Sequence, residues 1–167
     1  NLVVVSPNTV DFQPNLKELR EKITAKTKAM IVNTPNNPTG VVYSEKTIQE
    51  LSDILREKQK ELGTSIYLIS DEPYRELAYD GILVPYIPNY FENTIVCYSY
   101  SKSLSLPGER IGYLVIPNTV DDFDNVISAA NVANRILGFV NAPSLLQRAV
   151  AKCVDAEVNV EAYNKNR

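Results

Sequence analysis

Short runs of apolar, β-branched residues recur along this chain and alternate with amphipathic segments, which leaves few possible folds. Each run has the length of a buried strand and is bounded by turn-forming residues. The runs fall at residues 2–5, 28–32, 66–69, 94–98 and 111–116. Buried strands that alternate with helices favour a layered α/β domain with a largely parallel sheet.

Helices are expected where apolar residues recur every three or four positions, over residues 16–23, 44–63, 120–130 and 145–154. Ser44 is a typical N-cap for the second of these segments, and Gly63 is a typical end. The last segment predicts a longer helix near the C-terminus. Residues 79–93 are rich in Tyr, Pro and Asn and predict a long surface loop.

Composition narrows the chemistry that the chain can carry. Its 167 residues include no histidine and carry a net charge of −3. The lack of histidine excludes Ser-His-Asp and Cys-His catalysis and a His-ligated zinc site within this chain. Cys97 and Cys153 lack metal-ligand spacing, so no metal is expected and a reducing cytoplasm is the default compartment. Because there is no basic block and no bilayer-length apolar run, neither nucleic acid nor a membrane is the expected partner.

Polar clusters directly follow three of the expected strands. Asn37 follows one strand, Asp71 and Tyr74 follow the next, and Ser99 and Lys102 follow a third. Ligands of parallel α/β sheets bind beyond the carboxyl ends of the strands. We therefore expect one site that is built from three loops.

Each of these residues has an ordinary structural explanation when it is considered alone. An isolated loop lysine such as Lys102 is usually solvated, and holding its amine neutral at physiological pH costs about 4–5 kcal/mol. Asp71 alone would be a turn or cap residue, whereas in a site it would be a buried carboxylate facing a cationic ring nitrogen. Tyr74 lies three residues further on, where its side chain can face the same ligand. Ser99 and Ser101 are expected to point the same way in a strand-like segment.

Taken together and in order, four segments resemble the pyridoxal-phosphate (PLP) motifs of class I/II aminotransferases of fold type I, such as aspartate aminotransferases. They are NTPNNPTG at 33–40, SDEPY at 70–74, SYSK at 99–102 and LPGERIGY at 106–113. The resemblance runs from about residue 10 to about residue 147, and the lysine-centred segment is its most specific part. It implies a three-layer αβα domain with a mostly parallel sheet, here an incomplete large cofactor domain.

The resemblance implies catalytic roles for three residues. Lys102 forms the Schiff base with the cofactor aldehyde and, once a substrate displaces it, moves the proton from Cα to the cofactor carbon. Asp71 pairs with the pyridine nitrogen and keeps it protonated, which makes the ring an electron sink. Tyr74 hydrogen-bonds the phenolate oxygen of the ring and so tunes the imine.

Four further residues complete the implied PLP site. Asn37 binds the same phenolate oxygen, and a cis peptide is implied at Asn37-Pro38. Ser99 and Arg110 hold the phosphate, with help from Ser101. Charge-assisted bonds between a guanidinium and a phosphate are each worth about 1.5–3 kcal/mol.

The implied activity is amino-group transfer between an amino acid and a 2-oxo acid, by a parent protein that is a cytoplasmic homodimer. We assign residues 1–142 to the central part of the large domain, and residues 143–167 to a C-terminal helix leading toward a small domain. Relatives carry a further phosphate-binding segment and a substrate-binding arginine that this sequence lacks, so the isolated chain is expected to be incomplete and inactive. Arg135 lies near where some relatives place an arginine for a distal substrate carboxylate, but its register is shifted.

Two alternatives stay open at the level of sequence. Relatives on this scaffold catalyse carbon–sulfur lysis or elimination with the same cofactor residues, since substrate contacts outside this chain decide the reaction. The chain can also be a non-catalytic fragment of a cofactor domain. A nucleotide-binding domain is disfavoured, because the chain has neither glycine-rich phosphate motif.

Overall fold

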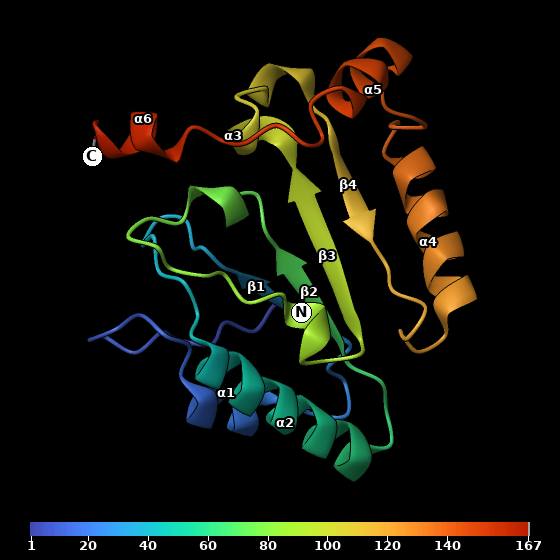
Figure 1. Ribbon diagram of the computed structural model, residues 1–167. Helices are drawn as coiled ribbons and strands as arrows, with labels where there is room; N and C mark the ends of the chain where they lie inside the picture. Colours follow the sequence, from blue (N-terminus) through green and yellow to red (C-terminus); the bar gives the residue numbers. More distant parts are fainter. Residues whose placement is uncertain (167) are drawn as a thin grey trace.

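The fold is built on a four-stranded sheet in the order β1-β2-β3-β4. The computed structural model describes residues 1–166. Strands β1 (Ala29–Asn33), β2 (Tyr67–Asp71) and β3 (Thr94–Ser99) run parallel, and β4 (Gly112–Val115) pairs antiparallel with β3 (Figure 1). The predicted mostly parallel sheet is confirmed.

The apolar run at residues 2–5 is not a strand, so that prediction is wrong. Leu2, Val3 and Val4 are exposed and have no regular structure. Within residues 1–166, β1 pairs with β2 and with no other strand. An apolar run becomes a strand where a neighbouring strand supplies main-chain hydrogen bonds, and among the described residues no strand pairs with this run.

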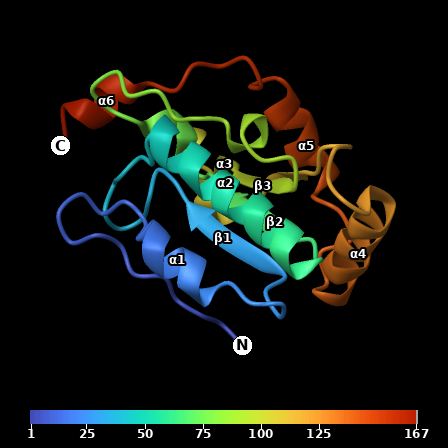
Figure 2. The same ribbon diagram turned by 90° about the horizontal axis from the view of Figure 1, so that it is seen from below.

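Helices α1 (Leu16–Lys22) and α2 (Glu45–Leu62) cover one face of the sheet (Figure 2). The caps expected for α2 are present, because the Ser44 side chain accepts a hydrogen bond from a main-chain amide of the first turn and Gly63 ends the helix in the left-handed conformation. The buried core joins both helices to β1 and β2 through Leu19, Val32, Ile48, Leu51, Leu55 and Leu68.

Helix α4 (Phe123–Ile136) lies against the opposite face, where its side chains share a cavity with residues of β2, β3 and β4. This gives the three layers that the sequence predicts. The short α3 (Tyr100–Ser103) follows β3 directly. The helix expected over residues 145–154 ends earlier, as α5 (Ser144–Ala151), and a separate α6 (Val160–Asn164) follows it. Cys153 and Val154 are exposed, so their helical spacing has no packing surface to match it.

The prediction of a surface loop at 79–93 is wrong in part. This segment contains the 3-10 turn η2 (Ile87–Asn89), and Ile87 and Phe91 are fully buried in the core. Burial of two large apolar side chains outweighs the turn-forming composition of the segment. Two further 3-10 turns, η1 (Arg75–Leu77) and η3 (Pro107–Glu109), lie beside α3.

Candidate active site

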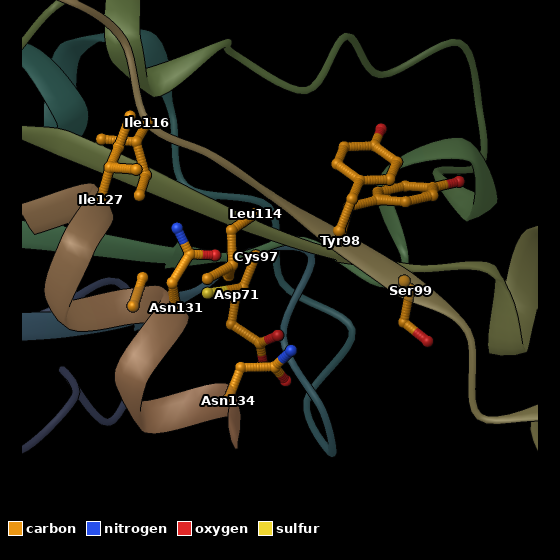
Figure 3. A pocket seen from close by; sticks show the side chains of 12 residues that line it. Asp71, Cys97, Tyr98, Ser99, Leu114, Ile116, Ile127, Asn131 and Asn134 are labelled. Carbon is orange, nitrogen blue, oxygen red and sulfur yellow. The ribbon is translucent and has the colours of Figure 1, made fainter. Parts of the chain in front are cut away.

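The carboxyl ends of β2 and β3 and the start of β4 meet at one cavity. The strand register places Asp71 beside Cys97, and Cys97 beside Leu114, in a row across the three strands. The cavity has a volume of ≈ 760 Å³, within the range of small-molecule sites. Figure 3 shows Asp71 and Asn134 pointing toward one another across it. The wall opposite the sheet comes from α4, through Ile127, Ala130, Asn131 and Asn134.

Asn33, the last residue of β1, makes hydrogen bonds to Asp71 on the neighbouring strand β2. Its Nδ2 donates to the Asp71 main-chain oxygen at 3.0 Å and to Asp71 Oδ2 at 3.2 Å. Its Oδ1 accepts a hydrogen bond from the Asn37 main-chain N–H at 2.8 Å. One amide therefore couples the aspartate to the loop after β1. Sequence reasoning missed Asn33, although its place directly after the strand expected at 28–32 was a signal for it.

Burial raises the pKa of Asp71 above its ordinary value, and the negative charge of Glu72 raises it further. The pKa of the Cys97 thiol is also raised, by burial first and then by the charges of Asp71 and Glu72. A cation in the cavity would lower both pKa values, because it stabilises the carboxylate and the thiolate. The electrostatics therefore suit a positively charged group facing Asp71.

Lys102 lies in α3, immediately beyond the end of β3. Its Nζ is 5.6 Å from the centre of the Tyr74 ring, a distance at which an ammonium is attracted to an aromatic face. Tyr74 comes from the turn after β2, between Asp71 and η1. The structure thus brings the predicted amine next to the predicted tyrosine, although the two arise from different loops.

Ser99 and Ser101 are joined through their hydroxyls, whose oxygens lie 2.6 Å apart. The expectation of a strand-like segment is wrong for Ser101, which lies inside α3. Ser99 is the N-cap of that helix, and its oxygen accepts a hydrogen bond from the Ser101 main-chain N–H. The two side chains meet because the chain turns after β3 into a helix rather than continuing as a strand.

Arg110 returns to the same edge of the sheet because β4 runs antiparallel to β3. Gly112 pairs with Ser99 in that register. A Cβ on Gly112 would lie 2.3 Å from the Tyr98 carbonyl oxygen, so this close pairing requires glycine. Arg110 itself has a φ of 52°, uncommon for a residue other than glycine, and its Nη1 donates to the Pro107 carbonyl at 2.7 Å. Its side chain is exposed.

The structure brings some of the predicted site residues into contact and leaves others apart. Among the described residues, the cavity lining includes Asp71 and Ser99 but not Lys102, Tyr74 or Arg110. Asn37 is linked to Asp71 through Asn33, and Ser101 to Ser99. The Asn37-Pro38 peptide is cis, as expected, and so is Thr34-Pro35. Arg135 lies exposed in the last turn of α4.

Comparison with known proteins shows which family shares this sequence. Residues 3–167 match the family described as Aminotransferase class I and II. The chain belongs to the class I and II aminotransferase family. The aminotransferase match covers the whole site, from the Asn37 loop to the end of β4.

Individual aminotransferases agree with this assignment. The chain is 35% identical to aromatic-amino-acid aminotransferase 2 of Thermococcus litoralis, over 66% of this chain and 28% of that protein. It is 33% identical to a probable aspartate/prephenate aminotransferase of Thermus aquaticus, over 93% of this chain and 39% of that protein. An amino transferase structure from Eubacterium rectale is 52% identical, with a TM-score of 0.96, over 99% of this chain and 42% of that one. The chain therefore spans less than half the length of these aminotransferases.

The donor set of this aminotransferase chain fits PLP, the cofactor generally used by the family. A carboxylate faces the cavity, which suits a protonated ring nitrogen. Hydroxyl groups and a guanidinium stand at the same sheet edge, which suits a phosphate. A primary amine lies one turn beyond β3. Asp71, Ser99, Ser101, Arg110 and Lys102 are therefore the residues that could hold the cofactor.

Proposed function

We propose that the protein containing this chain is a PLP-dependent aminotransferase that moves an amino group between an amino acid and a 2-oxo acid. The observation that carries the proposal is the row of loops at one sheet edge. Asp71 and Ser99 share a cavity there, and Lys102 lies beside Tyr74. The printed names of the relatives, which are aminotransferases, support the same reaction class.

In this proposal Asp71 keeps a proton on the cofactor ring nitrogen. The ring supplies an electron sink for the bond that is broken at the substrate Cα. Asp71 must act as an acceptor for that role, and Asn33 donates to it, so the amide stabilises the ionised carboxylate. The raised pKa of free Asp71 does not oppose the role, because a ring cation would lower it.

Lys102 supplies the amine that carries the cofactor and then moves the proton of the substrate Cα. Its position beside the Tyr74 ring keeps it at the edge shared by the loops after β2 and β3. Tyr74 and Asn37 are proposed to bind the ring oxygen. Ser99 and Ser101, whose hydroxyls already touch, are proposed to bind the phosphate with Arg110.

The proposal also covers the oligomeric state, the compartment and the domain boundaries of the longer protein. We propose that the longer protein is a homodimer and acts in the cytoplasm, where the free thiols of Cys97 and Cys153 stay reduced. The described residues contain no helix long and apolar enough to cross a bilayer. We also propose that residues 1–142 belong to the cofactor domain and residues 143–167 lead out of it.

Trapping the cofactor on its lysine tests the proposal. The longer protein that contains this chain is incubated with PLP, reduced with borohydride and digested, and the peptides are weighed. We expect a stable adduct on the peptide that contains Lys102. Lys102→Ala should abolish it, whereas Lys152→Ala, which changes an exposed lysine after α5, should not. An adduct spread over surface lysines, or one that survives Lys102→Ala, would count against the assignment.

A further inference from the structure

Glu72 is a buried carboxylate that the PLP proposal leaves without a role. It is 1% exposed. Its Oε1 accepts a hydrogen bond from the Ser70 hydroxyl at 2.7 Å, and its Oε2 accepts one from Arg75 Nε at 2.6 Å. Asp71 lines the cavity beside α4, whereas Glu72, directly after β2, bonds the buried Ser70 and is not part of that lining. A carboxylate this deeply buried is tolerated only with such partners.

Arg75 uses all three nitrogens of its guanidinium. Besides the bond from Nε to Glu72, Nη1 donates to the Val84 carbonyl at 2.9 Å and Nη2 to the Pro85 carbonyl at 2.8 Å. The guanidinium also lies 5.4 Å from the centre of the Tyr86 ring. Arg75 therefore ties the segment at 84–86 back onto the turn that follows β2.

We propose that Glu72 and Arg75 form a clamp that positions Asp71 and Tyr74, an inference that rests on the function proposed for those two residues. Glu72 follows Asp71 and Arg75 follows Tyr74, so the pair closes the turn that carries both. The Glu72 main-chain N–H donates to the Cys97 carbonyl at 2.9 Å, which fixes the end of β2 against β3. The two residues act through the backbone of the turn and are positioning residues.

A second arginine clamp holds the far end of the same loop and offers a matched control. Arg56 of α2 donates to Glu92 from Nη2 at 2.9 Å and from Nε at 3.1 Å, and it also bonds the Tyr90 carbonyl. The Arg56 and Glu92 side chains are 40% and 46% exposed, compared with 25% and 2% for Arg75 and Glu72. Arg56→Lys serves as the control, because it weakens contacts at residues 90–92 and leaves the turn after β2 unchanged.

The test compares Arg75→Lys, Glu72→Gln and Arg56→Lys in the full chain without cofactor. The pKa of the Asp71 carboxyl is measured by 13C NMR, with Cys97 and Glu72 as the titratable neighbours. A loosened turn exposes Asp71, so we expect its pKa to fall toward the ordinary value in the first two variants. Glu72→Gln also removes a negative charge, which acts in the same direction. Arg56→Lys should leave the pKa unchanged.

Amide hydrogen exchange supplies a second measurement. Residues 71–77 should exchange on the order of tenfold faster in Arg75→Lys, because a lysine cannot make the three bonds of the guanidinium. The same amides should exchange at the original rate in Arg56→Lys. If Arg75→Lys fails to fold, Glu72→Gln, which keeps the size of the side chain, serves in both measurements.

An unchanged Asp71 pKa and unchanged exchange at 71–77 would overturn the clamp. A lower melting temperature with neither change would show a purely structural pair and would overturn it as well. The borohydride adduct at Lys102 is measured on the same samples. If the longer protein that contains this chain, treated in the same way, forms no adduct, the proposed function fails, while the NMR and exchange results still decide the clamp.

Discussion

The part of the molecule built from α1, α2, β1 and β2 has a continuous apolar core, whereas the part built from α4, α5 and α6 has almost none. Core residues such as Ile48 and Leu55 are fully buried. In α4, all of which the structure describes, no residue is buried. Leu137 and Phe139, just beyond α4, expose most of their apolar surface. Both parts contain amphipathic helices, so amphipathic spacing alone does not create a core.

The comparison teaches that the packed part determines both the stability of the chain and the position of the strand ends at the cavity, whereas the exposed part adds one wall. The packed part fixes the strand ends, and with them Asp71 and its partner Asn33. The exposed part supplies only the far wall of the cavity, through α4. Changes in the packed part should therefore lower the stability of the chain strongly, and changes in the exposed part should lower it little.

The largest expected difference is between two leucine truncations. Leu55→Ala removes a side chain with 0% exposure and should lower the free energy of unfolding by about 2–5 kcal/mol. Leu137→Ala removes one that is 70% exposed and should change it by less than about 0.5 kcal/mol. Urea unfolding followed by circular dichroism measures both. Equal losses would mean that the two parts are not different in packing.

A glycine pair tests the border between the parts, where β4 begins. Gly112→Ala puts a methyl group against the Tyr98 carbonyl and should destabilise the chain by about 1–3 kcal/mol. A Cβ at Gly108 meets no atom within 4 Å, so Gly108→Ala is the control and should be nearly neutral. Thermal unfolding compares them. A neutral Gly112→Ala would show that β4 can shift away from β3 without loss.

Two asparagines give the next smaller effect. Asn33→Ala breaks the bonds to Asp71 and to the Asn37 loop and should cost about 1 kcal/mol. Asn125→Ala on α4 removes one exposed bond to Asp122 and should cost less than about 0.5 kcal/mol. Urea unfolding reports the stabilities, and the PLP adduct yield reports the site. An adduct yield that is equal in the two variants would remove Asn33 from the site.

The smallest effect concerns the two thiols, Cys97 on β3 at the cavity and Cys153 just beyond α5. Cys153 is exposed and should react with iodoacetamide before the half-buried Cys97, whose pKa is raised by burial. Asp71→Asn removes a negative charge that also raises the Cys97 pKa. The thiolate fraction at a given pH should then rise, and Cys97 should react faster by less than about tenfold. Mass spectrometry of both peptides between pH 7 and 9 checks this, and a slower Cys97 would contradict the sign.

Local chemistry could be predicted from the sequence, whereas contacts between distant segments could not. Ser44 and Gly63 bound α2 as expected, because capping depends on a few neighbouring residues. The apolar run at 2–5 was assigned wrongly, because a strand depends on a partner that spacing cannot reveal. Asn33 went unnoticed for a related reason: its amide acts across the sheet on Asp71. Lys102 and Asp71 are predictable from the sequence because each lies within a contiguous motif.

The reversal of direction at β4 has a consequence for how such a site can be inherited. Because the chain doubles back after β3, Ser99, Ser101, Lys102 and Arg110 are encoded within one short stretch of sequence. A single recombination event could exchange this stretch between homologous genes as a unit. Asp71, at the end of β2, and Asn37, in the loop after β1, would remain with the recipient. Chimeras made at the ends of this stretch would show whether the two sets of residues still function together when they come from different parents.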